Sequence, residues 1–246
     1  MQIVITMAGL GSRFRKAGYT VPKYEIEVFG RSLFSWSMES LRGFFLPDND
    51  YYFIVRREDN AAPFIKSEWE KIAGDPLRVH VIELDAPTDG QATTAMLAAP
   101  MWRKDDSLLI YNIDTYVEAY QMKAEDIQGD GFIPCFSAPG DHWSFVAVDE
   151  NGDATEVREK VRISDNCTLG AYYFATCKLY EDMYDEYYKD PSNLEKGEKY
   201  VAPLYNHMIR KGMKVRISLV DGKCVHVLGT PEELHLFEST YKHDER

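Results

Sequence analysis

A glycine-containing segment near the start of the chain has the residue types that a polyphosphate site needs. Gly9 and Gly11 follow a short apolar run, and Ser12 and Arg13 come directly after them. Glycines let the backbone approach a bulky anion and adopt positive φ, so that successive N–H groups can point at phosphate oxygens. Arg13 adds a planar guanidinium, and Lys23 follows as a second cation. The segment therefore predicts a site for a nucleoside triphosphate.

A single acidic residue stands where such a site would need a divalent cation. Asp114 directly follows the apolar run 108–113. A carboxylate in this position commonly caps the next turn. Beside a triphosphate it is better explained as a hard oxygen ligand for Mg²⁺, which also binds phosphates and water. We therefore predict that Asp114 binds Mg²⁺.

The elements that must position these residues alternate along the first half of the chain. Apolar and β-branched runs predict strands, and runs with apolar residues at helical spacing predict helices between them. This order predicts a parallel sheet covered on both faces, with the ligand beyond the carboxyl ends of the strands, where the glycine loop and Asp114 fall. The predicted strands are 2–5, 51–55, 77–84 and 107–113, and the predicted helices are 31–38, 59–73 and 89–99.

After about residue 130 the predicted strands lie closer together in the sequence. Asn151-Gly152 is a strong hairpin signal, and Thr230 with Pro231 has the cap and first-turn proline of a helix start. No linker or repeat separates the two halves, so we expect one mixed-sheet domain over residues 1–246. The predicted strands are 132–137, 143–148, 154–161 and 169–175, the helices are 178–189 and 201–210, and a last hairpin joins 214–220 to 223–228.

Charge and cysteine content limit the classes of partner. A net charge of −12 argues against nucleic acid or an anionic membrane, although basic residues near the glycine loop can still form a local cationic pocket. No run is apolar for long enough to cross a bilayer and no signal peptide is evident, so we expect a cytoplasmic protein. The aromatic content leaves room for a subunit interface, so a homo-oligomer stays open. Neither a disulfide framework nor a zinc site is expected from Cys135, Cys167, Cys177 and Cys224.

The glycine loop and the Pro-Lys pair at 22–23 together resemble the signature of the sugar-phosphate nucleotidyltransferases. The resemblance covers nearly the whole chain and is to small, single-domain members associated with bacterial capsule and surface polysaccharide synthesis. It implies a Rossmann-like (GT-A-like) α/β fold, with a mixed, mostly parallel sheet flanked by helices. It also implies that about residues 1–130 bind the nucleotide and about residues 131–246 bind the acceptor. The nucleotide contacts expected are Ala8, Gly9, Gly11, Ser12, Asp89, Gly90 and Gln91.

The resemblance also indicates residues for the acceptor. Glu159 and Lys160 match the family's Glu-Lys element, in which Glu binds an acceptor hydroxyl and Lys meets the acceptor phosphate. Gly170 and Tyr172 follow at the family's spacing, and Gly170 is expected to line the same pocket. Without the resemblance, the charged residues 158–160 would be read as a solvated cluster.

The reaction implied is in-line attack of a phosphomonoester oxygen, as on a sugar 1-phosphate, on the α-phosphorus of a nucleoside triphosphate, with release of pyrophosphate. Arg13 would stabilise the leaving pyrophosphate and Lys23 the reacting phosphates, with Asp114 on the Mg²⁺. No general base is needed, because a phosphate dianion is already ionised near neutral pH.

One position departs from the family pattern. Val227 stands where the closing Asp-x-Gly-Thr-Pro motif usually has a second metal-binding Asp. His226 cannot simply substitute, because neighbouring strand residues face opposite ways. Either Asp114 and phosphates hold the metal alone, or Asp221, Asp165 or another carboxylate assists, or activity is impaired.

Other functions therefore stay open. One is a cytidylyltransferase for a non-sugar phosphate, such as a choline, glycerol or amino-alcohol phosphate, with aromatic side chains near the acceptor. Another is a catalytically silent nucleotide-binding protein, which Val227 suggests. A glycosyltransferase fits less well, because Asn112-Ile113-Asp114 supplies only half of an Asp-x-Asp motif.

Overall fold

The apolar runs of the first half of the chain form parallel strands of one sheet. They are β1 (Gln2–Thr6), β4 (Asp50–Arg56), β5 (Val79–Leu84) and β6 (Leu108–Asn112). β1 pairs with β4 on one side and β6 on the other, and β5 lies beyond β4. The computed structural model describes residues 1–73 and 78–241, so the predicted start of β5 at residue 77 lies outside the described residues.

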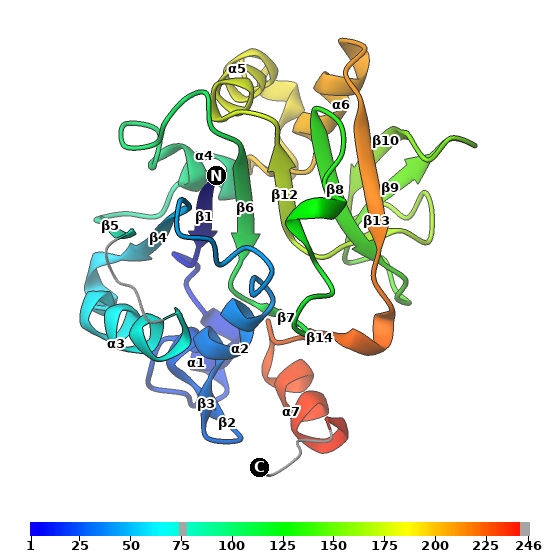
Figure 1. Cartoon of the computed structure of the whole chain (residues 1–246). Coiled ribbons are helices and arrows are strands. Elements are labelled where there is room, and N and C mark those ends of the chain that lie inside the picture. The colour runs from blue at the N-terminus through cyan, green and yellow to red at the C-terminus, as the bar shows by residue number, and fades with distance from the viewer. Residues whose placement is uncertain (74–77, 242–246) are drawn as a thin grey trace.

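The second half of the chain extends the same sheet with antiparallel strands. These are β8 (Gly131–Phe136), β9 (Ser144–Val148), β10 (Ala154–Glu159), β11 (Cys167–Thr168) and β12 (Ala171–Phe174). β12 pairs with β6 and so joins the two halves. β9 and β10 form the hairpin predicted from Asn151-Gly152, where Gly152 has φ +80°. In Figure 1 the sheet runs from β5 at the left, through β1, β6 and β12, to β10 at the right.

The predicted last hairpin is wrong, because its two strands join different sheets. β13 (Val215–Leu219) pairs in parallel with β8. β14 (Val225–Val227) pairs antiparallel with β7 (Thr115–Val117) in a separate two-stranded sheet. A 3₁₀ turn at Gly222–Cys224 lies between them. The pairing of β14 with β7 brings the last part of the chain next to Asp114.

Alternate side chains of β1 pack into cores on opposite faces of the sheet. Ile3 and Ile5 belong to a cluster that includes residues of α2 (Leu33–Glu39) and α3 (Ala62–Ala73). Val4 belongs to a second cluster, because successive strand residues face opposite ways. The helices that contribute to this second cluster are α4 (Gln91–Met96), α5 (Cys177–Tyr187) and α6 (Leu204–Arg210).

A third cluster packs the two ends of the chain together. Phe14 of α1 (Ser12–Lys16) is buried in it with Leu228 and with Leu234 of α7 (Pro231–Thr240). The Thr230 Oγ1 accepts a hydrogen bond from the Glu233 N–H at 3.1 Å, which confirms the predicted helix start. A short hairpin of β2 (Glu27–Val28) and β3 (Arg31–Ser32) lies beside α2. α7 lies at the foot of Figure 1, below β14.

The predicted α/β architecture is confirmed: helices flank a mixed sheet, in which the strands from the first half of the chain pair in parallel. The four cysteines are free thiols. Over residues 1–73 and 78–241, none of the helices combines the length and the apolar sequence that crossing a membrane requires.

Candidate active site

A cavity of about 530 Å³ lies at the carboxyl ends of β1 and β6, where the sequence places the ligand. Segments far apart in the sequence meet in its walls, because the parallel strands end at the same edge of the sheet. Residues that no sequence pattern marked also line it, among them Thr6, Glu198 and Tyr200. The predicted residues in its lining are Ala8, Gly9, Gly11, Ser12, Arg13, Lys23, Gly90, Gln91 and Asp114.

The glycine loop presents Arg13 to this cavity. Gly11 has φ +59°, a left-handed conformation that glycine adopts without strain, and α1 begins at the next residue. Arg15, two positions after Arg13, instead lies 3.9 Å from Asp59. Among the ion pairs formed within residues 1–73 and 78–241, none uses Arg13, whose side chain is exposed. Its guanidinium is therefore available to an anionic ligand.

Lys23 and Asp114 form an ion pair in the wall of the cavity. The Lys23 Nζ lies 3.0 Å from the Asp114 Oδ2, and the Asp114 side chain is 35% exposed. Burial alone would raise the pKa of Asp114, but the Lys23 ammonium, with a smaller effect from Arg13, holds that pKa below its ordinary value. Asp114 is therefore an anion at neutral pH, with two cations close to it.

Polar side chains hold Gln91 across the strand ends. Its Nε2 donates to the Asn112 Oδ1 and, at 3.3 Å, to the Thr6 Oγ1. Thr6 ends β1 and Asn112 ends β6, so both partners belong to the rigid sheet. The amide of Gln91 is thus positioned before a ligand arrives.

The turn before Gln91 is clamped against a distant segment. A Cβ at Gly90, which has φ +140°, would lie 2.3 Å from the Lys199 carbonyl oxygen, so only glycine permits this approach. The Lys199 N–H donates to the Asp89 carbonyl at 2.8 Å, and the Lys199 Nζ lies 2.8 Å from the Asp89 Oδ2. The predicted nucleotide residue Asp89 therefore supports the wall and does not line the cavity.

The predicted acceptor residues Glu159 and Lys160 lie together beside the cavity. The Lys160 Nζ is 3.2 Å from the Glu159 Oε1 and donates to the Tyr200 hydroxyl at 3.0 Å. Partial burial alone would lower the pKa of Lys160, but Tyr200 and Glu159 together raise it. Ser144 donates to Glu159. Lys160 is therefore connected to the cavity by its hydrogen bond to Tyr200, which lines the cavity.

The other two predicted acceptor residues, like Glu159 and Lys160, are not part of the lining of the cavity itself. Gly170 has φ +76°, and a Cβ there would lie 2.6 Å from the Asn112 Nδ2, so it supports a lining residue. Tyr172 is only 4% exposed, and its hydroxyl lies 3.2 Å from the Thr168 Oγ1. The side chain of Tyr172 packs in the core under α5 and α6, and its hydroxyl is close enough to Ser144 and Glu159 to interact with both.

Comparison with solved structures decides the family. The nucleoside-diphosphate-sugar pyrophosphorylase from Vibrio cholerae RC9 is 34% identical in sequence to this chain, and its structure superposes with a TM-score of 0.88. The match covers 97% of this chain and 100% of that one. The chain belongs to the sugar-phosphate nucleotidyltransferase family. The predicted family and its Rossmann-like fold are thereby confirmed.

More distant structures share the fold of this nucleotidyltransferase. A protein assigned as a glucose-1-phosphate thymidylyltransferase from Bacillus anthracis is 16% identical, with a TM-score of 0.78 over 100% of this chain and 98% of that one. The CTP:phosphocholine cytidylyltransferase from Streptococcus pneumoniae is 17% identical, with a TM-score of 0.70 over 98% of this chain and 99% of that one. No protein-family model and no curated protein matches the sequence.

The position of Val227 in this nucleotidyltransferase is next to Asp114. Val227 pairs with Thr115, and the following residue, Leu228, donates its N–H to the Asp114 carbonyl at 2.8 Å. The two alternative carboxylates named from the sequence point elsewhere. The Asp221 Oδ1 accepts from the backbone N–H of residue 223 in the 3₁₀ turn, and Asp165, 82% exposed, pairs with the guanidinium of residue 162. Neither of them lines the cavity.

The surroundings of Asp114 fit a divalent cation. A Cβ at Gly229 would lie 3.4 Å from the Asp114 Oδ2, so the missing side chain leaves space beside the carboxylate. Within the described part of the chain, no three His, Cys, Asp or Glu side chains gather as a metal cluster. A site with few protein ligands suits Mg²⁺, which one or two carboxylates hold together with phosphates and water.

Proposed function

We propose that this chain transfers a nucleoside monophosphate from a nucleoside triphosphate to a sugar 1-phosphate and releases pyrophosphate. The observation that carries the proposal is that one cavity at the sheet edge brings together Arg13, Lys23 and Asp114. Sequence identity of 34% over 97% of the chain with a pyrophosphorylase supports it. The product would be an activated precursor for surface polysaccharide.

The protein's part in this reaction is positioning and charge neutralisation. The acceptor phosphate is already ionised near neutral pH, so it attacks the α-phosphorus without a side-chain base. Arg13 would bind the leaving pyrophosphate, and Lys23 would move from Asp114 to the reacting phosphates. Arg13, which forms no ion pair within the described residues, would stabilise the developing charge without such a move.

Magnesium is the proposed cofactor. Asp114 would hold it together with the phosphates, and when bound it neutralises their negative charge. The fit of Mg²⁺ rests on the hard oxygen of Asp114 and on the space beside Gly229.

The two halves of the chain would divide the substrates between them. Residues 1–130 would bind the nucleotide, with the base near Gly90 and Gln91. Residues 131–246 would bind the acceptor through Glu159 and Lys160, as parts of the single domain expected from the sequence. A cytoplasmic location and small-molecule partners fit these substrates, and a net charge of −12 disfavours nucleic acid.

Pyrophosphate release tests the proposal. Each common nucleoside triphosphate is combined with Mg²⁺ and each of a set of acceptors: hexose 1-phosphates, phosphocholine and glycerol phosphate. Release that requires one triphosphate and a hexose 1-phosphate, and that Asp114→Asn abolishes, is the expected result. Release with phosphocholine or glycerol phosphate alone would favour the non-sugar alternative, and no release with any pair would contradict transferase activity.

A further inference from the structure

Two carboxylates, those of Asp114 and Glu233, lie near Gly229. A Cβ built on this glycine would lie 3.4 Å from the Asp114 Oδ2 and also 3.4 Å from the Glu233 Oε2. The two carboxylate oxygens are therefore no farther apart than twice that distance. Glycine leaves the volume between them free of any side chain of its own.

The carboxylate of Glu233 does not serve the structural role that its position suggests. A Glu three residues after a capping Thr usually returns a hydrogen bond to the backbone N–H of the cap. Here Thr230 accepts from the Glu233 N–H at 3.1 Å. Within residues 1–73 and 78–241, however, no hydrogen bond or ion pair uses the Glu233 carboxylate. The side chain is half-buried beside Gly229 and Asp114.

Rigid elements hold Glu233 in this place. Leu228 and Leu234 are buried at 0% and 1% exposure in the same cluster, one before Gly229 and one after Glu233. The Leu228 N–H donates to the Asp114 carbonyl at 2.8 Å, which ties the start of this segment to the end of β6. The two carboxylates are thus held near each other by the fold and not by mutual attraction.

The local charge balance favours a cation between them. Like charges at this separation repel each other. Lys23, 3.0 Å from the Asp114 Oδ2, pairs with only one of the two, and Arg13, the other cation near Asp114, forms no ion pair with either of them within the described residues. A divalent cation with water ligands would contact both carboxylates and would release Lys23 to bind phosphate.

We propose that Glu233 is the second protein ligand of the divalent cation, in the role for which Val227 has no side-chain oxygen. This role rests on the proposed function, which supplies the triphosphate that completes the coordination. Mg²⁺ is the expected ion, because both ligands are hard carboxylate oxygens. α7, a helix of the acceptor half of the sequence, thereby contributes to the metal site of the nucleotide half.

Binding of Mn²⁺, with no other ligand added, tests Glu233 without relying on turnover. The free ion is followed by its electron paramagnetic resonance signal during titration of wild type, Glu233→Gln, Asp114→Asn and Glu232→Gln. Glu232→Gln is the matched control, because it removes the same charge from the same turn of α7 at an exposed position. We expect Glu233→Gln to weaken Mn²⁺ binding by about tenfold or more, as Asp114→Asn does, and Glu232→Gln to change it by less than about twofold.

Three outcomes would overturn the role of Glu233. Glu233→Gln could bind Mn²⁺ as tightly as the wild type, Glu232→Gln could weaken binding as much as Glu233→Gln does, or the wild type could fail to bind Mn²⁺. Circular dichroism of each variant confirms that it is folded. Pyrophosphate release is measured on the same preparations: an active wild type with an unaffected Glu233→Gln disproves only this role. A wild type inactive with every substrate pair disproves the proposed function, and the Mn²⁺ titration still decides whether Glu233 binds the ion.

Discussion

The single ammonium group of Lys23 has two expected partners, the carboxylate of Asp114 and the phosphates of the substrates. In the free chain it lies 3.0 Å from Asp114 and lowers the pKa of that carboxylate. During the reaction it is expected to bind the phosphates, which leaves Asp114 to the metal ion. The ion pair would therefore stabilise the free site and compete with the proposed cation.

Removing this ammonium should have opposite effects on metal binding and on the reaction. Lys23→Met takes one positive charge from beside Asp114, so Mn²⁺ should bind roughly threefold to tenfold more tightly. The rate of pyrophosphate release should fall by about 100-fold, because a donor to the phosphates is lost. Mn²⁺ titration and the pyrophosphate assay measure the two effects. Weaker Mn²⁺ binding in Lys23→Met would show that the ammonium does not compete with the ion.

Lys160 should act on the acceptor and not on the nucleotide. It is bonded to Glu159 and Tyr200 at the cavity edge. In Lys160→Met we expect KM for the acceptor phosphate to rise about tenfold, as the loss of a charged contact implies, with KM for the triphosphate nearly unchanged. Lys178→Met, which removes an exposed lysine of α5, is the control. An unchanged acceptor KM would remove Lys160 from the acceptor site.

Local sequence patterns identified three charged residues that the structure brings together in the wall of the cavity. Arg13, Lys23 and Asp114 could be predicted because strand, loop and charge are contiguous in the sequence. Tyr200 and Glu233 could not, since Tyr200 lies in irregular backbone and Glu233 looks like an ordinary capping residue. The positions of Tyr200 in the cavity wall and of Glu233 beside Gly229 depend on long-range packing that no local pattern encodes.

At the level of elements, the contact between the Gly90 turn and the Lys199 segment closes one wall of the cavity. The two backbones are so close that a Cβ at Gly90 would overlap three backbone atoms of Lys199: the carbonyl oxygen at 2.3 Å, the nitrogen at 2.5 Å and the carbonyl carbon at 2.8 Å. The contact links the turn before α4 to the segment that leads into α6.

Gly90→Ala should therefore destabilise the fold more than an equivalent change in open space. Gly152→Ala is the control, because Gly152 also has positive φ, +80°, but no atom lies within 4 Å of a Cβ there. Backbone strain costs about 1–3 kcal/mol at either position, and the clash at Gly90 adds to it. Urea unfolding should show a loss for Gly90→Ala that exceeds the Gly152→Ala loss by about 1–2 kcal/mol. Equal losses would mean that the Lys199 segment moves away freely.

The positions of the strands could be predicted where apolar residues recur regularly in the sequence. The pairing partners of the strands could not be predicted where the pairing is long-range. The strands of the parallel half and the Asn151-Gly152 hairpin follow from local sequence. The strands β13 and β14 also could be located, but their partners could not, because a short turn between two strands usually gives a hairpin. Here β13 forms its backbone hydrogen bonds with β8, and β14 forms its own with β7.

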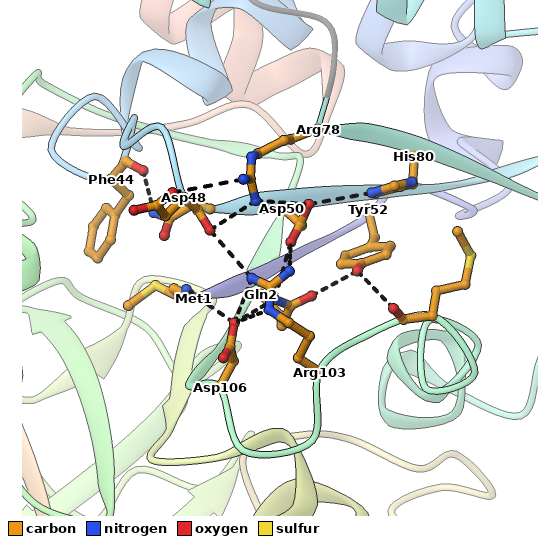
Figure 2. A network of polar contacts seen from close by, with 12 residues as sticks. Met1, Gln2, Phe44, Asp48, Asp50, Tyr52, Arg78, His80, Arg103 and Asp106 are labelled. Carbon is orange, nitrogen blue, oxygen red and sulfur yellow. Dashed lines mark hydrogen bonds and ion pairs between the residues drawn. The ribbon is translucent and has the colours of Figure 1, made fainter.

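Over the whole molecule, the two ends of the parallel strands differ: the cavity lies at their carboxyl ends, and a network of ion pairs lies at their amino ends. At the amino ends of the strands, opposite the cavity, Asp50 is surrounded by Gln2, His80 and Arg103, as Figure 2 shows. Arg103 also bonds Asp106, at 2.6 Å. Burial alone would raise the pKa of Asp50, but the hydrogen bonds and charge of Arg103 outweigh it and hold the pKa below its ordinary 3.8.

Arg103→Met should therefore destabilise the fold in a pH-dependent way. Ionised Asp50 stabilises the fold above its ordinary pKa, and this contribution is lost as the pH falls through the lower folded value. We expect a loss of about 2 kcal/mol at pH 7, moderated because Arg103 is half-exposed, that shrinks below about pH 4. Urea unfolding at several pH values measures it. Arg78→Met, which removes a more distant charge at 3.7 Å, is the control and should cost less than half as much; equal losses would contradict the assigned role.

The measurement that most directly tests the whole account is calorimetric titration of each common nucleoside triphosphate, with Mg²⁺, into wild type and Arg13→Ala. The account predicts that at least one triphosphate binds the wild type and that Arg13→Ala binds it about tenfold or more weakly. If no triphosphate binds, or if the variant binds as tightly as the wild type, the glycine loop is not the triphosphate site.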